Sequence, residues 1–213
     1  MKRSLMVSLS FAAAMSVVTQ INAQTAKDPY NPQTQHTGAV PAVEPSLEDM
    51  GFGTDQGNIG PFVTNTDKQY AQAMAARGMM EIRLGQAALD KSEREDVKKV
   101  AKRMIADYLG WDEGMAKAAK RVSITLPTEL DEKQKAEVDK VCALSGPAFD
   151  EAYLKEVIRL QTKALTMSHH EASDASGVSG FRHWAGIVIP NIQDEIHLAQ
   201  TTLQASAAVV SKK

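Results

Sequence analysis

Hydrophobic residues recur every three or four positions along most of the chain after position 65, a spacing that predicts amphipathic helices. The first helix is expected over residues 66–89, with Thr66 or Asp67 as its N-cap. No sustained alternation of hydrophobic and polar residues occurs, so the pattern predicts no strands. The inward face of this helix is expected to carry Tyr70, Met74, Arg77, Glu81, Leu84 and Ala88.

The second expected helix opens with Ser92-Glu93-Arg94-Glu95, which fits a capping box. One unbroken stripe at steps of three and four residues follows and is the strongest structural signal in the chain. A shorter helix is expected over residues 131–143, before a break at residues 145–147. The stripe consists of Val97, Ala101, Met104, Tyr108, Trp111, Met115, Ala118 and Val122.

A third long helix is expected from about Ala148, and a fourth begins with Phe181 and Trp184 and bends or starts its main part at Pro190. The third points Phe149, Tyr153, Val157, Leu160, Ala164 and Met167 inward, with Gln161 beside that stripe. The fourth points Val188, Ile192, Glu195, Ala199 and Thr202 inward. The fold class predicted is all-α: a four-helix bundle with a short extra helix in the connection between the second and third long helices.

The N-terminal residues have a different composition. Lys2 and Arg3 precede a mostly apolar stretch, and Ala23 offers a small residue for cleavage, so residues 1–23 are interpreted as a secretory signal peptide. The apolar stretch is too short to span a bilayer. Residues 24–65 hold five prolines and five glycines, which predicts a disordered spacer. The folded domain is expected over residues 66–206, with a C-terminal tail at 207–213.

Composition and charge then limit the classes of function that the chain fits. The 213 residues are 43% hydrophobic and 23% charged, enough for one domain plus extensions. The net charge is −2, and it becomes −4 without residues 1–23, whose charged residues are Lys2 and Arg3. This balance argues against nucleic-acid binding, which needs a basic footprint. A single cysteine, Cys142, excludes an internal disulfide. The mature protein is expected to be periplasmic or secreted, with no transmembrane span once the signal is removed.

Glu81 and Glu195 lie on faces that are otherwise apolar, where a carboxylate must be paired, hydrogen-bonded or bound to metal. The simplest partner for Glu81 is Arg77, one turn away. Bundles that hold two metal ions commonly carry two Glu-x-x-His motifs, and this chain has none. The nearest pattern, Asp194-x-x-His197, occurs once and lies mainly off the inner stripe.

The remaining polar residues give little indication of chemistry. His169 and His170 are expected at the surface, and Cys142 as a small hydrophobic residue. No nucleophile elbow, phosphate-binding glycine loop or dinucleotide fingerprint occurs, so no catalytic residues are assigned. A solvated outer face of the second helix is expected to carry Lys98, Lys99, Lys102 and Arg103.

Several short motifs, taken in their order and spacing, resemble the bacterial domain-of-unknown-function 4142 family. They are Glu81-Ile82-Arg83-Leu84-Gly85, Met104-Ile105-Ala106-Asp107, Leu126-Pro127, Phe149-Asp150 with Tyr153-Leu154, and Ile189-Pro190. The resemblance covers residues 67–203. It implies an exported, ferritin-like helical bundle whose biochemical role is not established.

The chain departs from that family at three positions. Where the family pattern usually has histidine, this chain has Tyr108, Gln161 and Glu195. A helical rise of about 1.5 Å per residue puts Tyr108 and Gln161 at nearly one level and Glu81 about two turns away. The resemblance implies a possible cluster of the three family histidines. Its replacements suit a transition metal poorly, but they are able to hydrogen-bond one another.

Three functional hypotheses follow. The preferred hypothesis is a non-enzymatic role in binding or envelope-stress support, with a protein of the cell envelope as a partner. The alternative is a metal-binding redox or storage protein with a degenerate site in the bundle core. Its cofactor is a transition metal ion, and its candidate ligands are Glu81, Tyr108, Gln161 and Glu195. A third hypothesis is that the folded domain is an interaction module carried on the spacer, which would bind a partner and not a metal ion.

Overall fold

The computed structural model describes residues 63–210, and within that range every regular element is an α-helix. The predicted all-α class is therefore confirmed. The predicted signal peptide, nearly all of the predicted spacer and the last three residues of the predicted tail lie outside the described residues. The helices are α2 (Asn65–Lys91), α3 (Glu95–Arg121), α4 (Glu132–Cys142), α5 (Gly146–Ser173) and α6 (Ser179–Val210).

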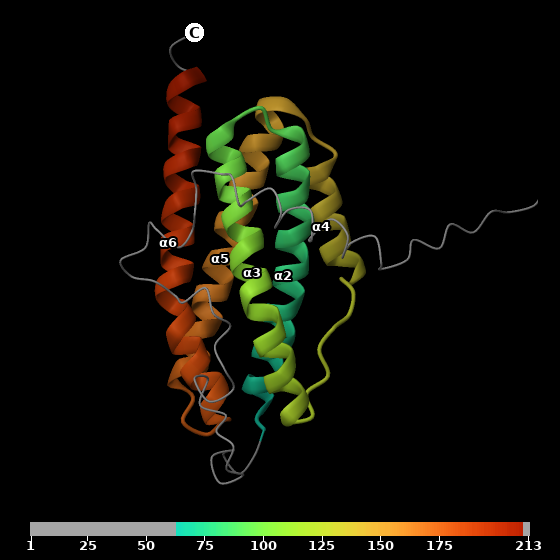
Figure 1. Ribbon diagram of the computed structural model, residues 1–213, viewed down its shortest axis with the longest axis vertical. Coiled ribbons are helices and arrows are strands. Elements are labelled where there is room, and N and C mark those ends of the chain that lie inside the picture. The colour runs from blue at the N-terminus through green and yellow to red at the C-terminus, as the bar shows by residue number, and fades with distance from the viewer. Residues whose placement is uncertain (1–62, 211–213) are drawn as a thin grey trace, which may run out of the picture. The chain divides into compact units, whose positions relative to one another are not determined.

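The four long helices pack side by side as two antiparallel pairs, α2 with α3 and α5 with α6 (Figure 1). The pairs meet where α2 contacts α5 and where α3 contacts α6. The short helix α4 lies in the connection between α3 and α5 and packs against both α2 and α5. Across residues 63–210, none of the helices has the length and apolar character that crossing a membrane requires.

Two of the expected helix caps are wrong. The N-cap of α2 is Thr64, and Asp67 is its partner at the third helical position in a capping box. At the start of α3, Arg94 is the N-cap and makes no side-chain capping bond. Ser92 instead ends α2, where its amide donates to the carbonyl of Ala88 at 3.1 Å. The hydroxyl of Ser92 accepts from the amide of Arg94 at 3.1 Å, and the capping box predicted over residues 92–95 does not form.

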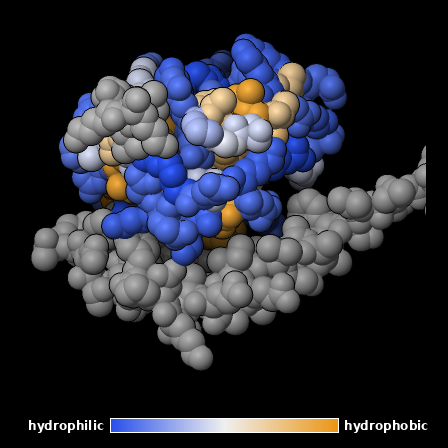
Figure 2. Space-filling view, turned by 90° about the horizontal axis from the view of Figure 1, so that it is seen from above, coloured by the Kyte–Doolittle hydropathy of each residue, from blue (hydrophilic) through white to orange (hydrophobic). Residues whose placement is uncertain are grey.

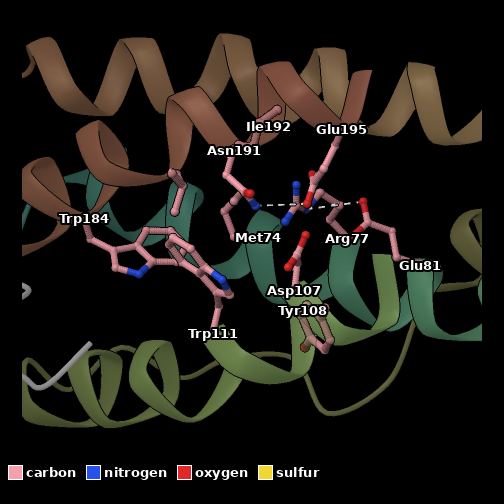
Figure 3. A pocket seen from close by; sticks show the side chains of 11 residues that line it. Met74, Arg77, Glu81, Asp107, Tyr108, Trp111, Trp184, Asn191, Ile192 and Glu195 are labelled. Carbon is pink, nitrogen blue, oxygen red and sulfur yellow. Dashed lines mark hydrogen bonds and ion pairs between the residues drawn. The ribbon is translucent and has the colours of Figure 1, made fainter. Parts of the chain in front are cut away.

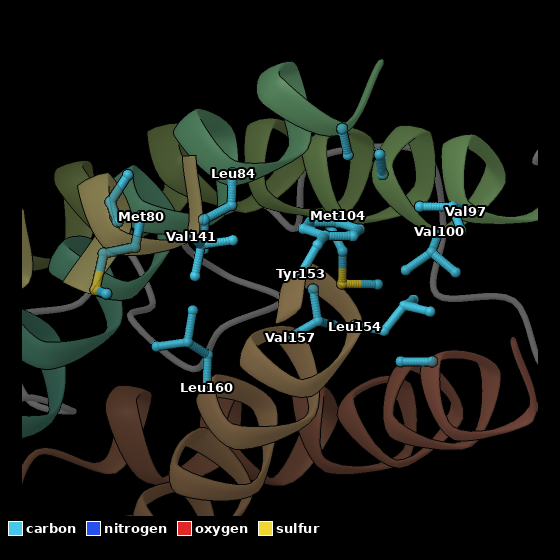
Figure 4. Close-up of a cluster of buried hydrophobic side chains, with 14 of the residues drawn as sticks. Met80, Leu84, Val97, Val100, Met104, Val141, Tyr153, Leu154, Val157 and Leu160 are labelled. Carbon is cyan, nitrogen blue, oxygen red and sulfur yellow. The ribbon is translucent and has the colours of Figure 1, made fainter. Parts of the chain in front are cut away.

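Most residues of the expected inward faces are buried, and they form two hydrophobic clusters. The expected inward residues that are only half-buried are Arg77, Tyr108, Trp111, Val122 and Met167. The first cluster includes Tyr70, Met115, Phe181 and Trp184. The second includes Leu84, Met104, Phe149 and Tyr153 (Figure 4). Each long helix contributes to both clusters, so the clusters follow one another along the helices. What separates them is polar and forms the candidate site.

The surface fits the sequence pattern in most places. Figure 2 shows a mainly hydrophilic face with apolar residues in small groups. Among the described residues, the exposed large hydrophobic side chains are Val63 and Leu144. His169 and His170 are exposed, as expected, and Pro190 lies inside α6 instead of starting a new helix.

Candidate functional site

A layer of polar side chains crosses the interior between the two hydrophobic clusters. We call it the polar layer. Its position follows from the chain order, since on each long helix these residues lie at or next to the change from one cluster to the other. Its members are Arg77 and Glu81 of α2, Arg103, Asp107 and Tyr108 of α3, Gln161 of α5, and Asn191 and Glu195 of α6.

Arg77 joins α2 to α5 within this layer. Its Nη1 donates to Oε1 of Gln161 at 2.6 Å, and its Nε lies 3.6 Å from Oε1 of Glu81. Gln161 is buried and its Nε2 lies 3.3 Å from the sulfur of Met104. The pairing of Glu81 with Arg77, expected from their spacing of one turn, is confirmed.

Arg103 joins α3 to α6. Its Nε pairs with Oδ2 of Asp107, and its Nη2 donates to Oδ1 of Asn191. Asn191 in turn donates from Nδ2 to Oε1 of Glu195 at 3.1 Å (Figure 3). The expectation that Arg103 lies on a solvated outer face is therefore wrong. A long side chain beside the buried Met104 reaches inward, and the carboxylate and amide there compensate for its burial.

Tyr108 takes a different direction from the other members of the layer. Its hydroxyl donates to Oδ1 of Asp112 at 2.9 Å, toward the exposed edge of α3, and lies 3.5 Å from the carbonyl of Ala75. Its ring lies over Gly78. The residues Tyr108, Gln161 and Glu195 therefore share one layer but are not hydrogen-bonded to one another. Tyr108 donates to Asp112, whereas Gln161 and Glu195 accept from Arg77 and Asn191 of the layer.

The layer holds three acids and two arginines, so the positive charges are fewer than the carboxyl groups. Burial raises the pKa of Glu81, with Asp107 adding to the rise and Arg77 opposing it. Burial also raises the pKa of Glu195 well above its usual range, as do the charges of Asp107 and Glu81 and a hydrogen bond with Asp107. The electrostatics therefore favour a proton on one of these buried carboxyls.

A small cavity opens onto the layer. Its volume is about 20 Å³, enough for roughly one water molecule and too small for an organic substrate. Arg77, Glu81, Tyr108, Trp184 and Glu195 are among its lining residues (Figure 3). Nε of Arg77 and Oε1 of Glu81 are buried without a hydrogen bond from any described residue. A water molecule in this cavity has room to satisfy them.

Glu81 lies closer to the other candidates than the helical rise predicts. It was expected about two turns from Tyr108 and Gln161, yet it lines the same cavity as Tyr108 and Glu195. Counting residues from helix ends assumes that the ends are level and ignores the reach of the side chains. All four candidate residues are therefore brought together, directly or through Arg77.

The donor set does not fit a transition metal ion. Within residues 63–210, no group of three histidine, cysteine, aspartate or glutamate side chains has an arrangement suited to one. The guanidinium of Arg77 pairs with Glu81, and its charge also opposes the rise in the pKa of Glu195. A cation placed between these carboxylates would therefore be repelled by a fixed positive charge. Arg103 likewise neutralises Asp107.

Sequence reasoning missed Arg103, Asp107 and Asn191. The signal that was available is the four-residue spacing from Arg103 to Asp107 and from Asn191 to Glu195, which places each pair on one helix face.

The fold and site define an all-helical protein with a charge-paired polar layer in its interior. Residues 55–202 match the family described as "Domain of unknown function (DUF4142)", and the chain belongs to that family. The resemblance seen in the sequence is thereby confirmed. No curated protein and no solved structure matches the chain.

Proposed function

We propose that this chain is an exported helical-bundle protein that supports the bacterial cell envelope by binding a partner protein and does not act as an enzyme. The observation that carries the proposal is the placement of Arg77 and Arg103 among the three acids of the polar layer. These arginines pair with the carboxylates that a substrate or a metal ion would otherwise bind. The polar layer then acts as a structural element.

We infer that the four long helices form a ferritin-like four-helix bundle. Two features support this inference: the antiparallel pairs α2–α3 and α5–α6, and the long connection that carries α4 between them. In such a bundle a polar layer fixes which helix faces meet, because a slipped register leaves buried charges unpaired. The arginines therefore serve helix pairing.

Export is supported by residues 1–23, in which two basic residues precede an apolar stretch and a small residue at the end. Mass spectrometry of the protein from its native host tests it. The proposal expects a chain that begins near Gln24 in the periplasmic or secreted fraction. A cytoplasmic chain that retains Met1 contradicts it.

Complementation tests the non-enzymatic role. In a strain that lacks the gene, the proposal expects sensitivity to envelope stress, and the full gene restores growth. The Glu195→Gln variant, which keeps the shape of the side chain and removes its charge, is expected to restore growth equally. The matched control is Gln200→Glu on the exposed face of α6. Failure of Glu195→Gln to restore growth at normal protein abundance indicates chemistry at the layer and contradicts the proposal.

A further inference from the structure

A second group of buried acids lies away from the polar layer, where the first turn of α2 meets the loop between α5 and α6. Asp67 joins the two segments. Its Oδ2 accepts from the amide and the hydroxyl of Thr64, both at 2.7 Å, and its Oδ1 accepts from the amide of Val178 at 2.9 Å. Both carboxyl oxygens of Asp67 act as hydrogen-bond acceptors. Asp67 therefore anchors the loop to α2.

The fit between loop and carboxylate is close. A Cβ placed on Gly177 would lie 2.7 Å from Oδ1 of Asp67, so the backbone of the loop packs directly against it. Nearby, the hydroxyls of Tyr70 and Ser168 lie 3.0 Å apart and join α2 to α5. This end of the domain is therefore held by two polar contacts, that of Asp67 with the loop and that of Tyr70 with Ser168.

Glu171, on the last turns of α5, is the unexplained member of this group. It is 1% exposed, and neither of its carboxyl oxygens has a hydrogen-bond donor among the described residues. Its polar neighbour is the carboxylate of Asp67. Two facing carboxyl groups form a hydrogen bond only when one of them carries a proton. Because both oxygens of Asp67 already accept hydrogen bonds from Thr64 and Val178, the geometry points to Glu171 as the carboxyl that carries this proton.

The surrounding charges agree with this assignment. Burial raises the pKa of Glu171 to about 8, and interactions with Asp67 and Asp174 add to the rise. Arg182, from α6, opposes it. The titratable or charged groups around Glu171 are Asp67 and Tyr70 of α2, His170 and Asp174 at the end of α5, and Arg182 of α6.

We propose that Glu171 is a pH-sensitive latch, whose protonated carboxyl donates to Asp67 and holds the loop between α5 and α6 against the first turn of α2. When the O–H bond of Glu171 breaks, its proton passes to solvent and two carboxylates face each other. Their repulsion releases the loop. The latch is independent of the proposed function and of the polar layer.

The sign of the pH effect follows from the raised pKa. The unfolded chain loses this proton near pH 4.5, the ordinary value, whereas the folded chain keeps it up to about pH 8. The latch therefore stabilises the fold fully below pH 4.5, and this contribution is lost as the pH rises toward 8.

The Glu171→Gln variant of the mature chain tests the latch, because an amide donates to Asp67 without titrating. The matched control is Glu132→Gln, whose side chain is 96% exposed. Between pH 5 and 8, the unfolding constant of the unmodified chain is expected to rise on the order of a hundredfold more than that of Glu171→Gln. Glu132→Gln is expected to follow the unmodified chain. Parallel pH profiles for the unmodified chain and Glu171→Gln overturn the proposal.

A second measurement needs no variant. Carbon-13 NMR of the unmodified chain follows the Glu171 carboxyl, and hydrogen exchange follows the amide of Val178. The proposal expects a midpoint near pH 8 and a loss of protection at Val178 over the same range. A midpoint near 4.5, or protection at Val178 that does not change with the titration, overturns it.

Discussion

The ring of Tyr108 on α3 occupies the space that a side chain at Gly78 on α2 would need. A Cβ placed on Gly78 would lie 1.4 Å from Cε2 of Tyr108. The two helices therefore approach closely at the edge of the polar layer, and the ring covers the backbone of α2 where the cavity begins. A glycine in mid-helix lowers helix stability, and here it is required by the close approach.

Replacing Gly78 by alanine is expected to destabilise the protein. The added methyl group displaces the ring of Tyr108, and such overpacking costs about 1–3 kcal/mol. In the Tyr108→Ala background the same change is expected to be neutral, or to stabilise by up to about 1 kcal/mol, because alanine favours helix. Urea unfolding of the four chains of this double-mutant cycle measures the coupling.

The matched control for that cycle is Gly110→Ala on α3, where a new Cβ meets no atom within 4 Å. It is expected to stabilise the helix in both backgrounds. If Gly78→Ala behaves as Gly110→Ala does when Tyr108 is present, the contact between ring and helix does not exist as described.

The pairing of Arg77 with Glu81 gives a second prediction. Arg77→Met removes the guanidinium and leaves Glu81 buried without its cation, which is expected to cost about 3–5 kcal/mol. The double variant Arg77→Met/Glu81→Leu is expected to recover most of that loss, since no unpaired charge remains. Arg83→Met, exposed on the same helix, is the control and is expected to change the free energy of unfolding by less than about 0.5 kcal/mol. Equal losses in the single and double variants refute the pairing.

The raised pKa of Glu195 predicts a dependence of stability on pH. The unfolded chain releases this proton at lower pH than the folded chain does. Its contribution is therefore complete below pH 4.5, the ordinary value, and declines as the pH rises toward the raised folded value. The decline is at most about 1.4 kcal/mol per pH unit for one carboxyl.

Comparison with Glu195→Gln measures the effect of Glu195 together with its interaction with Glu81, because Glu171 lies in a separate group and remains in both chains. Thermal or urea unfolding from pH 4.5 to 8 is expected to show a shallower decline for Glu195→Gln. Identical slopes would mean that Glu195 titrates alike in the folded and unfolded chains.

The helices were predictable from the sequence because burial repeats along them. Val97, Met104 and Met115 fall on one stripe of α3, and each is buried. The helix ends were less predictable because capping depends on neighbours in space and along the chain. Ser92 has the right side chain to begin α3, yet it ends α2. The spacing of residues alone does not decide between these uses.

The polar layer was only half predictable. Glu81 and Glu195 stand out because they interrupt apolar stripes. Arg103 lies one position before Met104 of the buried stripe, and its inward direction depends on Asn191 of another helix. The height of Glu81 relative to Tyr108 and Gln161 depends on how far α2 is shifted along the neighbouring helices. Counting residues within one helix gives no information about that shift.

We propose that the arginines and a proton balance the acids of the polar layer, so that the layer holds no transition metal ion. Calorimetric titration of zinc and copper into residues 24–213, prepared without a tag, tests this most directly. The triple variant Tyr108→His/Gln161→His/Glu195→His is the comparison, because imidazole is a ligand for both ions. The account predicts no stoichiometric micromolar binding by the unmodified chain and tighter binding by the triple variant. Stoichiometric micromolar binding by the unmodified chain that Glu195→Ala abolishes would contradict it.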